Sequence, residues 1–192
     1  PPFYDTWWFK LLVAVCVLWI VWRVIHHLQN RIRDERILNQ FATSLYGKNS
    51  VEDIFWDVAS NCVKWLGYPD CVVYQHDEKR KVLVQRSAAG PKNPKQVREI
   101  FNQIELPLGV GVVGSVGATG KAERISNTFK DKRYVVDDAI RLSEITVPIK
   151  IDGKVFGVID SEHPQKNYYK RRDMRMLKKI AAICAERISK FM

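Results

Sequence analysis

The sequence predicts an α+β domain, in which an antiparallel sheet carries helices on its faces, preceded by one transmembrane helix and one signalling helix. Three observations predict it. An apolar run opens the chain, two β-rich hairpin patterns follow, and stretches of helical periodicity separate and flank those hairpins. The 192 residues are enough for one ordinary domain with attachments.

The apolar run WWFKLLVAVCVLWIVWRVI, residues 7–25, predicts a transmembrane helix, since about 20 apolar residues cross the hydrocarbon core. Its charges, Lys10 and Arg23, lie near its ends, and tryptophans stand where the two membrane interfaces favour them. Arginines follow the run, so the positive-inside rule places the C-terminal part in the cytoplasm. A buried core helix or a signal-peptide segment is the alternative, because the uninterrupted apolar stretch, residues 11–22, is short.

Residues 26–46 lack proline and glycine and can continue this helix inward as a signalling helix. An imperfect seven-residue apolar repeat favours pairing with a second copy, and a solvated spacer is the alternative.

The soluble domain begins with a helix whose start, Ser50 to Asp53, has capping-box character, and whose end is Gly67. The remaining elements follow in the order hairpin, helix, glycine-rich turn with a helix, strand, and hairpin. They are expected at residues 71–88, 97–104, 106–122, 122–127 and 143–163. The last hairpin turns at Asp152-Gly153.

Apolar residues at spacings of three and four run along the C-terminal helix, residues 173–192, and predict the seam of a two-stranded helical pairing. They are Met174, Leu177, Ala181, Cys184, Ile188 and Phe191. With the signalling helix, this seam predicts a homodimer through the N- and C-terminal helices. The predicted boundaries are therefore 1–6 for the end of an extracytoplasmic region, 7–25 for the span, 26–46 for the signalling helix, 47–172 for the sensory domain and 173–192 for the output helix.

Four stretches, LGVGVVGSVGATGKAERISN, DKRY, SEITVPIKIDGKVFGVIDSEHP and DMRMLKKIAAICAERI, resemble successive blocks of a GAF domain. The resemblance implies a sheet of about six antiparallel strands, a small-molecule pocket between sheet and covering loops, and terminal helices that dimerise. The opening PPFYDTWWF resembles the end of the three-tyrosine (Y_Y_Y) β-sandwich that precedes the membrane helix in many bacterial sensor kinases. Together they imply a membrane-bound bacterial sensor, with a histidine kinase region beyond Met192 and the GAF domain on the cytoplasmic side of the inner membrane.

The resemblance also implies which residues line the pocket: Tyr74, Val112, Val113, Tyr134, Asp137, Glu144 and Asp160. Carboxylates bordering an aromatic cavity suit an amine or an amino-acid-like ligand. The alternative is that Glu144 and Asp160 only accept hydrogen bonds from loop amides at the strand ends.

One enzyme resembles this pattern, the GAF-type reductase of free methionine sulfoxide, whose two ligand-gripping acids match Glu144 and Asp160. Its two cysteine positions fall on Val113 and Asp137 here, so the thiolate nucleophile is missing. We therefore predict a module without catalytic residues and without a known cofactor, which either senses an unidentified small molecule or serves as a structural relay without a ligand.

The formal charge of +10 suits nucleic acid, an anionic membrane or an acidic partner. A basic stretch near residues 166–179, with Tyr168 and Tyr169 inside it, raises nucleic acid as a rival partner. Because these charges flank the predicted helix seam, we favour a solvated helix face and predict no nucleic-acid binding. The four cysteines show no metal-ligand spacing, so no metal site is predicted.

Overall fold

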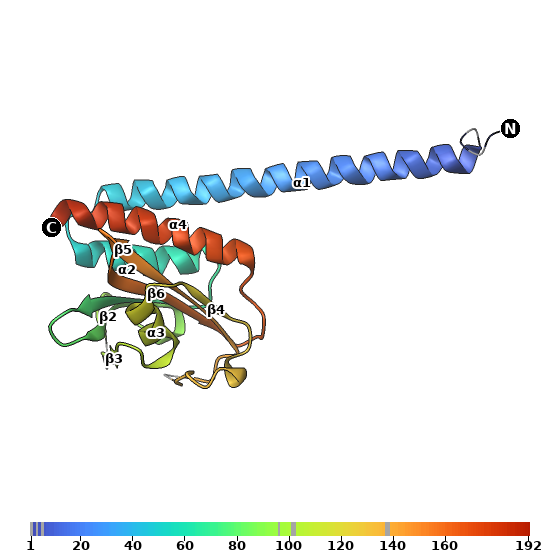
Figure 1. The fold of residues 1–192 in the computed structure, drawn as a ribbon. Coiled ribbons are helices and arrows are strands. Elements are labelled where there is room, and N and C mark those ends of the chain that lie inside the picture. Colours follow the sequence, from blue (N-terminus) through green and yellow to red (C-terminus); the bar gives the residue numbers. More distant parts are fainter. Residues whose placement is uncertain (1, 3, 5, 96, 101–102, 137–138) are drawn as a thin grey trace. The chain divides into compact units, whose positions relative to one another are not determined.

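The structure is a computed structural model that describes residues 2, 4, 6–95, 97–100, 103–136 and 139–192. The chain forms two compact units, Pro1–Ile37 and Leu38–Met192. Figure 1 shows the elements of both.

Helix α1, Trp7–Tyr46, is one continuous helix of 40 residues that contains both the predicted span and the predicted signalling helix. No proline or glycine interrupts it. The large apolar side chains of its N-terminal part are exposed, for example Leu11, Leu18 and Trp19. Among the described residues it is the one helix that is long and apolar enough to cross a membrane.

The second unit contains a six-stranded antiparallel sheet of strand order β3-β2-β1-β6-β5-β4, which confirms the predicted fold class. The strands are β1 Cys71–Asp77, β2 Val82–Ala89, β3 Glu105–Pro107, β4 Glu123–Ile125, β5 Ser143–Ile151 and β6 Lys154–His163. The helices are α2 Val51–Asn61, α3 Gly111–Thr119 and α4 Arg171–Ile188, with the short turns η2 Cys62–Leu66, η3 Gly90–Lys92, η4 Thr128–Lys130 and η5 Ser189–Phe191.

Helices α2 and α4 cover one face of the sheet, and α3 covers the other (Figure 1). Side chains alternate between the faces along each strand, so Ile145 and Val147 of β5 lie in the core beneath α4, whereas Thr146 between them points to the α3 side. On the α3 side Tyr74 and Val158 form a second apolar cluster with Val113 and Val116.

Local chemistry explains the element ends. Ser50 accepts the backbone N–H of Asp53 at 3.0 Å, which caps α2 as predicted. Asp152 and Gly153 both have positive φ, +51° and +79°, the backbone of the tight type I′ turn that an Asp-Gly pair favours.

The helix predicted at 97–104 is wrong for the described residues of that segment, which contain no helix, and β3 follows directly. The physical reason is that the backbone at Ile104 forms hydrogen bonds with β2. The N–H of Gln85 donates to the carbonyl of Ile104, and the N–H of Ile104 donates to the side-chain oxygen of Gln85. These bonds favour extended backbone over an isolated helical turn.

The interpretation of the α4 spacing as a pairing seam is also wrong. Leu177, Ala181, Cys184 and Ile188 are buried within the second unit, where α4 packs against β5. Apolar spacing of three and four describes any helix that covers a sheet, so the pattern could not distinguish a partner helix from the domain's own core. Dimerisation itself stays a prediction.

Leu177→Ala is expected to lower the free energy of unfolding by about 2–5 kcal/mol, because it leaves a cavity at a fully buried position. Urea denaturation measures the change. The control is Arg175→Ala, whose side chain is exposed on the same helix and is expected to change stability by less than about 0.5 kcal/mol. Equal stability of Leu177→Ala and wild type would contradict the placement of α4.

Candidate functional site

A cavity of about 250 Å³ lies on the α3 side of the sheet. Strands β1, β5 and β6, the first turn of α3 and the loop before β5 contribute to it. Its lining residues are Tyr74, Lys92, Ile104, Leu106, Gly111, Val112, Val113, Val135, Val136, Glu144, Asp160 and Glu162. Apolar groups therefore surround a small set of ionisable side chains, which is the usual composition of a small-molecule pocket.

Three carboxyl groups reach this cavity from the hairpin of β5 and β6. Glu144 stands opposite Glu162, and Thr146 stands opposite Asp160. Residues two apart on a strand share a face, so these four side chains form one polar cluster. Glu144, Asp160 and Glu162 are only 3%, 2% and 4% exposed, so water screens their charges poorly.

The Thr146 hydroxyl lies between the carboxyl groups of Glu144 and Asp160. The Thr146 hydroxyl lies 2.7 Å from Asp160 Oδ1, to which it donates, and 3.2 Å from Glu144 Oε1. Burial, and then the charges of Asp160 and Glu162, raise the pKa of Glu144 well above its ordinary value, which favours its uncharged form. Burial and the charge of Glu162 raise the pKa of Asp160 to about 7.

Lys92, from the turn η3, compensates part of this charge. Its Nζ lies 2.7 Å from Glu162 Oε2, and both side chains are almost fully buried. Burial is the largest influence on Lys92 and acts to lower its pKa, but the negative groups around it, Glu162 first and then Asp160 and Asp70 among them, together outweigh burial, and the pKa lies above its ordinary value. The charge of Lys92 also acts to lower the pKa of Asp160.

Asp70, just before β1, accepts hydrogen bonds from strand β6. Its Oδ1 accepts the backbone N–H of Glu162 at 2.8 Å and the Ser161 hydroxyl at 3.2 Å. Burial raises the pKa of Asp70 to about 6, although Lys92 acts to lower it. Asp70 is therefore the acid that binds a loop or strand amide, the structural role that the sequence left open for Glu144 and Asp160.

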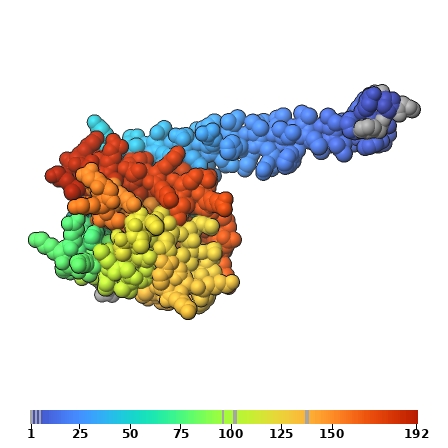
Figure 2. All heavy atoms as spheres, viewed as in Figure 1, coloured from blue at the N-terminus to red at the C-terminus, as the bar shows by residue number. Residues whose placement is uncertain are grey.

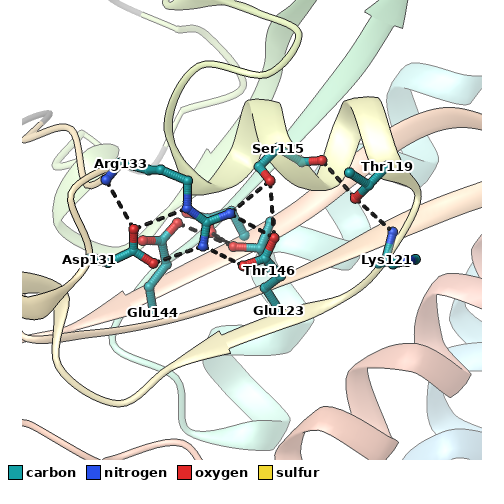
Figure 3. A network of polar contacts seen from close by, with 9 residues as sticks. Ser115, Thr119, Lys121, Glu123, Asp131, Arg133, Glu144 and Thr146 are labelled. Atoms are coloured by element: carbon teal, nitrogen blue, oxygen red, sulfur yellow. Dashed lines mark hydrogen bonds and ion pairs between the residues drawn. The ribbon is translucent and has the colours of Figure 1, made fainter.

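Arg133 holds the loop before β5, which covers the cavity, in place through hydrogen bonds and ion pairs (Figure 3). Its guanidinium donates to Ser115 Oγ of α3 at 2.8 Å, to Glu123 Oε2 of β4 at 2.6 Å and to Asp131 Oδ1 at 3.0 Å. Because Val135 and Val136 follow two and three residues later and line the cavity, this network fixes one of its walls.

Of the seven residues predicted for the pocket, Tyr74, Val112, Val113, Glu144 and Asp160 line the cavity. Tyr134 is absent from the lining, and its hydroxyl accepts the backbone N–H of Arg141 at 3.0 Å. Burial raises the pKa of Tyr134 to about 12. Asp137 lies outside the described residues. Ligand binding by these residues stays a prediction.

The residues predicted for the pocket did not include Glu162, although it is one of the three acids of the last hairpin, or Lys92. Glu162 could have been found, since it lies two residues after Asp160 on the same strand and must share its face. Lys92 lies in an irregular turn, where no periodicity indicates the direction of a side chain. Ile104, which also lines the cavity, was assigned to the incorrect helix at 97–104.

Residues 48–189 match the family model of the GAF domain. The chain belongs to the GAF domain family. A curated relative, protein YtsP of Bacillus subtilis (strain 168), is 38% identical over 78 residues, which are 41% of this chain and 48% of that protein. The chain thus spans about half the length of this relative.

Solved GAF-like structures agree with the fold. A GAF domain from a phosphoenolpyruvate-protein phosphotransferase of Coxiella burnetii superimposes with a TM-score of 0.74 and 18% identity, over 84% of this chain and 95% of that one. The free methionine-R-sulfoxide reductase of Neisseria meningitidis, in complex with its substrate, has a TM-score of 0.73 and 20% identity, over 81% and 88%. At these identities the likeness shows the GAF fold alone, and it includes both an enzyme and a domain of a larger protein.

The raised pKa of Asp160 predicts a pH dependence of stability. A carboxyl whose pKa is higher in the folded than in the unfolded chain stabilises the fold at pH values below its pKa in the unfolded chain. This contribution is lost as the pH rises from 3.8 to about 7. Asp160→Asn cannot ionise and keeps an acceptor for Thr146, so its stability is expected to decline less than that of wild type across this range. Urea denaturation at several pH values measures the difference.

The control for this experiment is Asp152→Asn, which removes an exposed carboxyl from the β5–β6 turn and is expected to retain the wild-type pH profile. If Asp160→Asn and wild type lose stability in parallel between these pH values, Asp160 is ionised throughout and the description of the cluster is wrong.

Proposed function

We propose that this GAF domain is a sensory module of a membrane-anchored bacterial signal-transduction protein, and that its cavity binds a small molecule through a cationic group. The observation that carries the proposal is the Glu144–Thr146–Asp160 cluster at the base of an apolar-walled cavity. The pKa of Asp160 is about 7, so this buried carboxyl is partly ionised at neutral pH, and Lys92, whose ion pair is with Glu162, compensates it only in part. A buried carboxylate is costly, and a ligand ammonium would reduce that cost.

The size of the cavity favours a small ligand. A volume of about 250 Å³ is slightly below the usual range for drug-sized molecules, so it suits a small amine or amino-acid-like compound. Valine side chains from α3 and from the covering loop would contact the apolar part of such a ligand.

We propose a binding role rather than a catalytic one, because the thiols of Cys71 and Cys184 lie on the face of the sheet that is opposite the cavity. Val113, which occupies a cysteine position of the reductase resemblance, lines the cavity. Cys71 and Cys184 are buried in the core beneath α2 and α4. Contact with the Cys62 sulfur and burial raise the pKa of Cys71, and burial raises the pKa of Cys184, so neither is a ready thiolate.

The relay part of the proposal rests on a joint between the end of α1 and the end of α4. The Arg187 guanidinium donates from Nε to the carbonyl of Leu45 at 3.0 Å and from Nη2 to the carbonyl of Lys48 at 2.6 Å. It also stacks near the rings of Tyr46 and Phe191. Since the last turn of α1 has no basic residue, Arg187 supplies its C-terminal cap from another helix.

In this proposal α1 crosses the inner membrane, its arginine-rich end and the GAF domain lie in the cytoplasm, and α4 continues into an output region. A histidine kinase is the output that the sequence resemblance favours, and parallel pairing of two copies would bring two outputs together. A shift of α1 would reach α4 through Arg187. A coupling of about 1–3 kcal/mol is typical of such links.

Asp160→Asn is expected to weaken binding of a small amine by about tenfold or more, because it removes the charge that the ammonium needs. Glu144→Gln should change affinity much less, since the raised pKa of Glu144 favours its uncharged form, which Gln resembles. Calorimetric titration with a panel of small amines and their neutral amide counterparts measures both effects, with Asp152→Asn as the charge-matched control. Equal binding of amines and neutral counterparts would refute the cationic ligand.

Arg187→Ala is expected to speed hydrogen exchange of the amides around residues 44–50, because it removes two hydrogen bonds and the cap of α1. Arg187→Lys should restore only part of the protection, since an ammonium cannot reproduce the planar pair of donors. Arg175→Ala, on the exposed side of α4, is the control and should leave these amides unchanged. Identical exchange in Arg187→Ala and wild type would remove Arg187 from the relay.

A further inference from the structure

A second hollow lies apart from the cavity, as a groove of about 480 Å³ between α4 and the segment that joins α3 to β4. Figure 2 shows the red surface of α4 meeting the yellow surface of the residues around 120. The groove is lined by Gly120, Lys121, Ala122, Val147, Pro148, Lys150, Lys178, Ala181 and Ala182. It shares no lining residue with the cavity.

The groove follows an open strand edge. Strand β4 pairs only its three residues, Glu123–Ile125, with Glu144–Thr146 of β5. Beyond Thr146, residues 147–151 of β5 have a neighbouring strand on one side only, within the part of the chain that the structure describes. An open edge presents backbone donors and acceptors that a further extended segment can pair with.

Three exposed lysines converge on this edge from three different elements. Lys150 belongs to β5, Lys121 to the turn after α3, and Lys178 to α4. None of their ammonium groups forms an ion pair with another described residue, whereas Lys92 is paired with an acid. The walls between them carry small side chains, alanines from α4 and from the start of β4, so the charges surround a narrow apolar channel.

Protection of the edge against aggregation explains part of this arrangement. Lysine and proline are common on exposed edge strands, and Lys150 and Pro148 fit that role. Lys121 and Lys178 lie outside the strand, so edge protection does not explain why they approach it. Their convergence adds positive charge to a surface that also offers backbone pairing.

We propose that this groove docks an extended, acidic segment of a partner protein, which pairs with the free edge of β5 while its carboxylates contact the three lysines. An extended peptide fits a channel that runs beside a strand, and alternate side chains would face the lysines and the alanine wall. The site is independent of the cavity and of any ligand bound there.

The test uses the full chain in nanodiscs of uncharged lipid and a labelled peptide of alternating glutamate and valine, with fluorescence anisotropy as the readout. The glutamate peptide is expected to bind, and the same peptide with glutamine in place of glutamate is expected not to bind. The triple variant K121E/K150E/K178E should weaken binding by about tenfold or more. The charge-matched control K79E/K81E/K190E, at exposed lysines elsewhere, should weaken it by less than about threefold.

Hydrogen exchange locates the contact. Bound peptide should slow exchange of those backbone amides among residues 147 and 149–151 that face the open edge, which edge pairing protects and which general attraction to a basic surface would leave unchanged. If the triple variant fails to fold, K121Q/K150Q/K178Q tests the same groove with a smaller expected loss. No binding of the glutamate peptide, equal losses in the groove and control variants, or unprotected β5 amides would each overturn the proposal.

Discussion

The burial of four carboxyl groups beside one lysine is the constraint that the rest of the site depends on. Glu144, Asp160, Glu162 and Asp70 are almost fully buried, and charges without partners in such a place would oppose folding. The structure reduces this cost in three ways: Lys92 pairs with Glu162, Asp70 accepts a backbone N–H, and the raised pKa of Glu144 favours its uncharged form. Asp160, whose pKa is raised to about 7, faces the cavity.

A glycine makes the position of Lys92 possible. Gly90, at the start of η3, has φ +81°, and a Cβ there would collide with the carbonyl oxygen of Pro69. Only glycine therefore lets η3 approach the start of β1 closely, and this approach places Lys92, two residues later, against Glu162. A backbone requirement in a turn thus determines the electrostatics of the site.

The β5–β6 hairpin serves both faces of the sheet. Glu144 lines the cavity and Thr146 points to the same face of the sheet, while the alternating residues Ile145 and Val147 pack in the core under α4. A change in protonation or occupancy at the carboxyls therefore acts on strands that also support the C-terminal helix. In the proposed relay, this hairpin connects the cavity with α4, and Arg187 connects α4 with the end of α1.

The sequence predicted features that depend on local chemistry. The Asp152-Gly153 turn, the Ser50 cap and both hairpins follow from backbone preference and alternation, and they carry Glu144 and Asp160 to one face. The C-terminal seam and the helix at 97–104 were misjudged because tertiary contacts decide them. An apolar helix stripe fits a sheet as well as a partner, and Gln85 holds Ile104 in extended backbone.

A ¹³C NMR titration of the side-chain carboxyls of Glu144, Asp160 and Glu162, assigned by substitution, tests the central claim most directly. The account predicts that Glu144 remains protonated at neutral pH and that Asp160 titrates near pH 7. It also predicts that binding of an amine shifts the Asp160 titration to lower pH. Ordinary titration of Glu144 and Asp160 near pH 4, in a folded chain, would show that water reaches these groups and would contradict a buried acid pair that selects a cation.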